Sequence, residues 1–114
     1  VGAALLAQDG RVFTGCNVEN AAYGLANCAE RTALFKAVSE GARRFTAIAI
    51  AGGPAENQAG PLPFCAPCGS CRQVLYEFGG KDLPVLLVRR EDDYEVHLLG
   101  ALLPLAFGPE ALGP

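Results

Sequence analysis

The sequence contains no methionine, a single histidine, and no run of clustered lysine or arginine; its formal net charge is −3. Tight binding to a nucleic-acid backbone needs clustered positive charge, so we expect no nucleic-acid partner. No apolar run approaches the roughly 20 residues that span a bilayer, so we expect no membrane partner either.

A signal-peptide pattern is also missing, because Val1 to Ala7 have neither a basic region nor a cleavage site. These residues are typical of the interior of a strand, and we expect an N-terminal segment to be absent from the chain. The five cysteines are an odd number, and Cys65, Cys68 and Cys71 follow at intervals of three residues. This spacing indicates metal or redox chemistry in a reducing compartment rather than a disulfide framework, so we expect a cytoplasmic protein.

The chain has 114 residues, of which 51% are hydrophobic and 18% charged. This length and composition predict one globular domain over residues 1–114. Asp9-Gly10 between two short apolar runs predicts a hairpin. Strands are predicted at 2–7, 11–16, 46–51, 83–89 and 95–99, helices at 28–40 and 68–78, and loops at 17–27 and 52–67. The proline-rich tail allows at most a short helix, so the order predicts one α/β sheet with helices packed on it.

Cys28-Ala29-Glu30-Arg31 and Pro67-Cys68-Gly69-Ser70-Cys71 each stand at the start of a predicted helix. Helix N-termini favour thiolate over thiol, and the sulfurs of Cys68 and Cys71 point the same way on a first turn. Zinc binds thiolates readily, and a catalytic zinc keeps three protein ligands and one open position. We therefore predict that Cys28, Cys68 and Cys71 hold one zinc ion, and that Glu30 moves protons beside it.

Three thiolates give a divalent ion a net charge of −1, which weakens it as a Lewis acid. Arg31 lies three residues after Cys28 and on the same helical face. We therefore predict that Arg31 donates hydrogen bonds to a ligand thiolate.

Other interpretations of the cysteines remain open. A redox pair at Cys68 and Cys71 lacks the strand that usually precedes one. A closed structural site using Cys28, Cys65, Cys68 and Cys71 is the main alternative, and an iron–sulfur site is a weaker one; neither explains Glu30. Cys16 is expected to be a small buried residue at the end of a strand.

Four segments together resemble the zinc-dependent cytidine deaminases, of the small homotetrameric type with cysteine ligands only. They are Val1-Gly2-Ala3-Ala4-Leu5, Cys16-Asn17-Val18-Glu19-Asn20-Ala21-Ala22-Tyr23-Gly24, Asn27-Cys28-Ala29-Glu30-Arg31-Thr32-Ala33 and Pro67-Cys68-Gly69-Ser70-Cys71-Arg72-Gln73. The resemblance implies a three-layer α/β/α sandwich with one mixed sheet of about five strands.

The resemblance also implies one zinc ion per chain, held by Cys28, Cys68 and Cys71, with water or hydroxide in the fourth position. The hydroxide attacks C4 of a cytosine ring, and Glu30 protonates N3 and then the leaving amino group. The products are uridine or deoxyuridine and ammonia. The remaining positions that match the family are Asn17 and Glu19 for ribose hydroxyls, Ala29 for the base edge, Arg31, Arg72 and Gln73 around the thiolates, and Tyr23 and Phe107 for a neighbouring subunit's site.

The family's base-stacking aromatic residue and the helix before it precede the position of Val1, and Cys65 is not a family ligand. Two other functions remain as alternatives: a deaminase of another aminopyrimidine, and a zinc-stabilised module without catalysis. Glu19 would repel a phosphate, which favours a nucleoside over a nucleotide.

Overall fold

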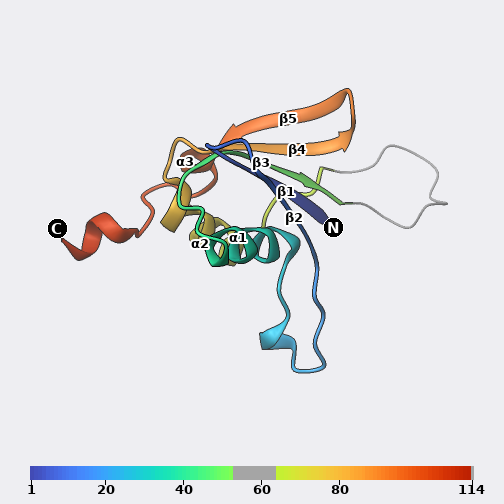
Figure 1. The fold of residues 1–114 in the computed structure, drawn as a ribbon, viewed down its shortest axis with the longest axis horizontal. Helices are drawn as coiled ribbons and strands as arrows, with labels where there is room; N and C mark the ends of the chain where they lie inside the picture. The colour runs from blue at the N-terminus through green and yellow to red at the C-terminus, as the bar shows by residue number, and fades with distance from the viewer. Residues whose placement is uncertain (53–63, 114) are drawn as a thin grey trace.

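The computed structural model describes residues 1–52 and 64–113 of the chain. Its elements in chain order are shown in Figure 1: β1 (Gly2–Ala7), β2 (Val12–Cys16), η1 (Tyr23–Leu25), α1 (Ala29–Ser39), β3 (Phe45–Ala51), α2 (Gly69–Gly79), β4 (Pro84–Arg90), β5 (Asp93–Leu98), α3 (Leu99–Leu102) and η2 (Pro109–Leu112). All five predicted strands and both predicted helices are present. The greater part of the predicted 52–67 loop lies outside the described residues.

The five strands form one sheet in the order β2-β1-β3-β4-β5. The β3–β4 pair is parallel, and the other three pairs are antiparallel. A hairpin joins β1 to β2 through the predicted Asp9-Gly10 turn, where Gly10 takes a φ of 93° that favours glycine. The sheet is therefore mixed, which confirms the predicted α/β class.

One face of the sheet packs against α1 and α2 (Figure 1). Alternate residues of β1 are buried because successive strand side chains point to opposite faces. The core joins this face to the buried sides of both helices: Ala3, Leu5, Ala7, Ile48, Ile50, Val85, Leu87, Ala33, Leu34, Ala37 and Leu75. Both long helices of the described residues lie on this face, so their N-terminal ends can approach each other there.

Gly15 allows β2 to pass directly over the first turns of α1. A Cβ atom built on Gly15 would lie 2.4 Å from the carbonyl oxygen of Ala29 and 2.6 Å from the backbone nitrogen of Ala33. Both neighbours are backbone atoms, which cannot rotate away as a side-chain end can. Glycine at this position therefore sets the distance between the strand and the helix that carries Glu30.

We expect Gly15→Ala to lower the free energy of unfolding by about 1–3 kcal/mol, the usual cost of overpacking, or by more. Chemical denaturation measures this change. Gly24→Ala is the matched control, because a Cβ at Gly24 meets nothing within 4 Å. Equal stability of the two variants would show that α1 does not depend on this close approach.

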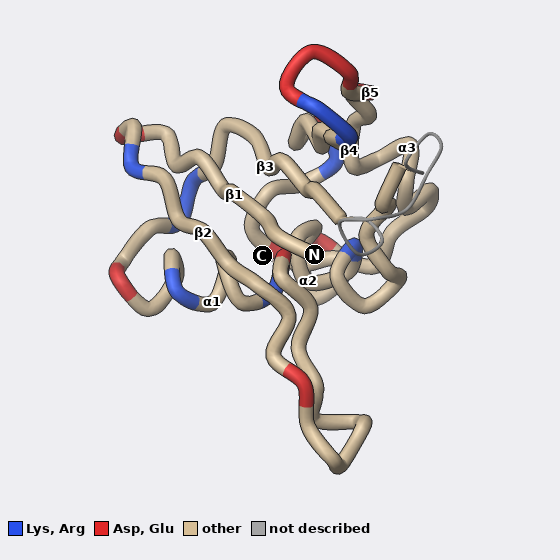
Figure 2. The backbone as a smooth tube through the Cα atoms, turned by 90° about the vertical axis from the view of Figure 1, so that its right-hand side faces the viewer, with Lys and Arg blue, Asp and Glu red and all other residues tan. Residues whose placement is uncertain are grey.

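Residues 17–27, called the arm below, project from the body in both views (Figures 1 and 2). An antiparallel bridge closes the base of the arm: Val18 N donates to Asn27 O over 2.8 Å, and Asn27 N donates to Val18 O over 2.9 Å. The arm carries η1, and Glu19 is its single charged residue (Figure 2). No helix in the described ranges is long and apolar enough to cross a membrane.

Candidate metal centre and active site

Three cysteines stand at the starts of the two long helices. Cys28 is the N-cap residue of α1, Cys68 is the N-cap residue of α2, and Cys71 lies in the first turn of α2. Both N-cap residues have extended backbone, with ψ values of 159° and 167°, which turns the chain into the helix. Cys71 is fully buried, with 0% of its surface exposed. The two helix starts therefore bring three sulfurs together at one edge of the core.

The three Sγ atoms lie within 4.8 Å of one another. Cys28 Sγ is 3.8 Å from Cys68 Sγ, and Cys68 Sγ is 3.4 Å from Cys71 Sγ. A tetrahedral zinc ion with bonds of about 2.3 Å places its sulfurs roughly 3.8 Å apart. The spacing of the thiols therefore fits a zinc ion with three cysteine ligands, as the sequence predicted.

Arg31 provides the positive charge next to the sulfurs. Its Nη2 lies 3.6 Å from Cys28 Sγ and donates to it. Its Nε is buried and, within the described part of the chain, has no hydrogen-bond partner. Hydrogen bonds with Cys28, followed by interactions with Cys71, raise the pKa of Arg31 against the effect of burial. The predicted contact between Arg31 and a thiol is present, and it draws negative charge away from the cluster.

The environments of the two thiols of α2 differ. Burial raises the pKa of Cys71, and hydrogen bonds with Cys68 and Glu30 raise it further. Burial opposes ionisation of Cys68 more than any other single effect, but hydrogen bonds from Cys71, whose backbone N–H lies 3.4 Å from the sulfur, and from Cys28 and Ser70 together outweigh it, so the pKa of Cys68 is lowered. A divalent cation held by the three sulfurs would favour their thiolate forms.

Glu30 is buried, with 3% of its surface exposed, and its carboxylate acts on the pKa of Cys71. Among the described residues, Glu30 is the only carboxylate that is buried. A carboxylate that has lost its water shell is expensive unless the site uses its charge or its proton. Glu30 forms no ion pair within the described ranges, and its position beside the sulfurs suits a group that exchanges protons with a bound molecule.

Asn17 lies at the same site but makes a contact that the sequence did not predict. Its Oδ1 accepts a hydrogen bond from the backbone N–H of Ala29 over 2.9 Å. The N-cap position of α1 is occupied by Cys28, which makes no side-chain cap bond. Alternate residues of a strand lie on the same face. The two-residue spacing of Gly15 and Asn17 was therefore the feature of the sequence that could have predicted this contact.

Arg72 and Gln73 bind backbone carbonyls instead of the sulfurs. The Arg72 guanidinium donates to Pro67 O over 2.8 Å and to Leu102 O over 2.7 Å. The Gln73 amide donates to Phe107 O over 2.6 Å. Arg72 therefore holds the backbone just before Cys68, and Gln73 attaches the C-terminal segment to α2.

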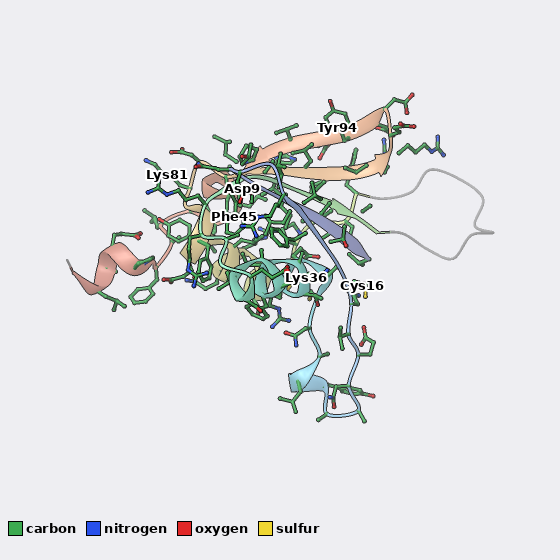
Figure 3. All side chains as sticks on the ribbon, viewed as in Figure 1. Asp9, Cys16, Lys36, Phe45, Lys81 and Tyr94 are labelled. Carbon is green, nitrogen blue, oxygen red and sulfur yellow. The ribbon has the colours of Figure 1, made fainter. Side chains whose placement is uncertain are left out.

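Among the described residues, the cysteine sulfurs that lie close together are those of Cys28, Cys68 and Cys71, and Cys65 is not one of them. It packs near Gly52, where an added Cβ would lie 2.9 Å from Cys65 Sγ. Cys16 is exposed at the end of β2, so the prediction that it is buried is wrong (Figure 3). The reason is that β2 is an edge strand, and Cys16 alternates with Gly15 onto the face away from α1.

Three other predicted site residues lie outside the buried cluster. Tyr23 is 89% exposed on the arm, and Phe107 is 62% exposed in the C-terminal segment. Glu19 is also exposed on the arm. Large exposed aromatic side chains are typical of surfaces that meet another protein chain.

Residues 1–87 match the family model described as the cytidine and deoxycytidylate deaminase zinc-binding region. The chain belongs to this family of deaminases. It is 50% identical over 112 residues to the cytidine deaminase of Sporosarcina psychrophila, covering 98% of this chain and 77% of that protein. It is 44% identical over 112 residues to the cytidine deaminase of Mycobacterium tuberculosis, covering 98% of this chain and 75% of that protein.

The family's fold is seen directly in a solved structure. The crystal structure of cytidine deaminase from Burkholderia pseudomallei matches with a TM-score of 0.81 and 52% identity, covering 93% of this chain and 80% of that chain. As a member of this zinc-binding deaminase family, the protein is a hydrolase whose three thiols fit the family's metal. The predicted fold class, enzyme class and cofactor are therefore confirmed.

Proposed function

We propose that this protein deaminates cytidine and 2′-deoxycytidine to uridine and 2′-deoxyuridine, with release of ammonia, in pyrimidine salvage. The observation that supports this most strongly is the buried carboxylate of Glu30 beside three thiols that fit zinc. The relatives named above carry the name cytidine deaminase and match nearly the whole chain. A closed structural zinc module would have no use for Glu30.

Each residue of the site has a role in the proposed reaction. Cys28, Cys68 and Cys71 would hold zinc, which when bound supplies activation of water for attack at C4 of the cytosine ring. Glu30 takes a proton from the attacking water and gives it to N3 of the ring; it then takes the proton of the hydroxyl added at C4 and passes it to the amino group, which leaves as ammonia. The burial of Glu30 keeps bulk water from competing for these protons.

The base and the ribose would be recognised by the segment that leads into α1. We assign Asn17 and Glu19 to the ribose hydroxyls and the backbone near Ala29 to the base edge. Glu19 is the single charge of the arm, and no lysine or arginine accompanies it there to bind a phosphate. A free nucleoside is therefore a better substrate than a nucleotide.

Tyr23 and Phe107 are assigned to the active site of a neighbouring subunit in a homotetramer. Their exposure supports this assignment, because two large aromatic side chains would otherwise remain in water. We place the protein in the cytoplasm, where reducing conditions keep the thiols available for the metal.

The direct test of this function is the loss of cytidine absorbance in the presence of zinc-loaded protein. We expect turnover to require zinc, to stop after chelation and to return when zinc is added back. Protein that holds one zinc per chain but leaves cytidine and deoxycytidine unchanged would contradict the proposal. Turnover of deoxycytidylate in preference to both nucleosides would overturn the assignment of Glu19.

Arg31→Gln is expected to shift the acidic limb of the pH–rate profile to higher pH. The guanidinium withdraws charge from Cys28 Sγ, 3.6 Å away, and without it the thiolates leave more negative charge on the metal. Steady-state rates over a range of pH measure the shift. Arg43→Gln is the matched control, because Arg43 binds Val38 O and Ala42 O at the other end of α1. A profile for Arg31→Gln that superimposes on the parent profile would contradict this role.

A further inference from the structure

We propose that Asn17 is a positioning residue, which fixes the first turn of α1 and thereby the place of Glu30 beside the thiols. This inference rests on the hydrogen bond that Ala29 N donates to Asn17 Oδ1 over 2.9 Å. Ala29 stands between Cys28 and Glu30, so the bond holds the peptide that joins a metal ligand to the proton-transfer group. The inference rests on the proposed deaminase function and adds a role for Asn17 besides ribose binding.

The first N–H groups of a helix have no partner within the helix, and the side chain of the N-cap residue usually binds one of them, at the second or third helical position. In α1 the N-cap residue is Cys28, and its side chain makes no cap bond. Its sulfur instead lies 3.8 Å from Cys68 Sγ and accepts from Arg31. The use of this position by a thiol therefore leaves the helix start without its usual local support. Asn17 instead binds the N–H of Ala29, the first residue of the helix, from another element.

The fold brings Asn17 to this point by close packing. Gly15 lets β2 approach Ala29 O and the backbone of Ala33, and Asn17 lies two residues further on the same face of the chain. Directly after Asn17, the bridge between Val18 and Asn27 closes the arm and returns the chain to Cys28. The side-chain bond of Asn17 and the backbone bridge thus clamp both chain segments that enter the site.

The remaining atoms of the Asn17 amide are compatible with a second role. A carboxamide has two N–H donors as well as its oxygen, and the bond to Ala29 uses only the oxygen. The donors remain for a ribose hydroxyl, which would accept from Asn17. One side chain then couples the position of the ribose to that of Glu30. Displacement of a reacting group by about 1 Å costs roughly a hundredfold in rate, so this coupling bears on kcat as well as on KM.

The two roles separate when the substrate has no hydroxyl to bind. We suggest measuring kcat and KM for 2′,3′-dideoxycytidine with the zinc-loaded parent, Asn17→Ala, Asn17→Asp and Asn20→Ala. Asn17→Asp keeps an oxygen acceptor for Ala29 N–H but lacks the N–H donors. Asn20→Ala is the matched control, because Asn20 Oδ1 binds the backbone N–H of Ala22 over 2.8 Å within the exposed arm.

With the dideoxy substrate, we expect Asn17→Ala to lose roughly ten- to a hundredfold in kcat, and Asn17→Asp to recover most of that loss. Asn20→Ala should match the parent. Equal kcat for Asn17→Ala and the parent would overturn the positioning role. So would a loss in Asn17→Asp as large as that in Asn17→Ala, because the acceptor oxygen is what the proposal requires.

A second measurement does not depend on catalysis. Amide hydrogen exchange at Ala29 should be slow in the parent and in Asn17→Asp, and faster in Asn17→Ala by about tenfold or more. An unchanged exchange rate in Asn17→Ala would overturn the proposal even if kcat fell. If the parent does not deaminate any cytidine analogue, the deaminase function fails, and the exchange rates still decide whether Asn17 holds the helix start.

Discussion

Glu30→Gln is expected to lower kcat for cytidine by about 10²–10⁴-fold, the usual contribution of a positioned acid–base group. Glutamine has nearly the same shape as glutamate but cannot accept and return a proton at neutral pH. The residue is buried next to Cys71, so the substitution keeps the packing and removes the proton-transfer group. Steady-state kinetics with matched zinc loading measure the loss.

Zinc content should stay at that of the parent, because Glu30 is not one of the three sulfur ligands. Glu40→Gln is the matched control, since Glu40 is an exposed carboxylate at the other end of α1 and should leave kcat unchanged. Activity of Glu30→Gln equal to that of the parent would mean that another group transfers the protons. Loss of zinc in this variant would mean instead that Glu30 helps to hold the metal.

Cys71→Ala is expected to abolish zinc binding, to below about 0.1 zinc per chain after dialysis, together with all turnover. Cys71 is the fully buried member of the trio, and its sulfur lies 3.4 Å from Cys68 Sγ. Two remaining thiols and an open side cannot complete a stable tetrahedral site. Elemental analysis of the purified variants gives the zinc content.

Cys65→Ser and Cys16→Ser are the matched controls, and both should bind about one zinc per chain. Cys65 lies near Gly52 rather than in the sulfur group, and Cys16 is exposed at the end of β2. Loss of zinc in Cys65→Ser would establish the closed four-cysteine site. Full zinc content in Cys71→Ala would remove Cys71 from the ligand set.

The elements and the sulfur trio were accessible from sequence because their signals are local. Short apolar runs predict β1 and β3, with β-branched residues at alternate positions of β3, and the Asp9-Gly10 turn predicts the first hairpin. Cys68 and Cys71 share one helical turn, so their spacing alone brings the two sulfurs together. The spacing of Arg31 from Cys28 predicted their contact for the same reason.

The contacts that the sequence did not reveal are set by tertiary packing. The bond between Asn17 and Ala29 depends on how closely β2 approaches α1, which Gly15 determines. The bond from Arg72 to Leu102 joins residues 30 positions apart, and no periodic pattern links them. The exposure of Cys16 follows from the edge position of β2, which only the strand order reveals.

The most direct test of the central claim is zinc-edge X-ray absorption on the zinc-loaded protein, because it counts the neighbours of the metal. We predict three sulfur neighbours at about 2.3 Å and one lighter atom at about 2.0 Å, the pattern of a site with three cysteine ligands and one exchangeable position. Four sulfur neighbours and no lighter atom would contradict a catalytic centre at the starts of α1 and α2.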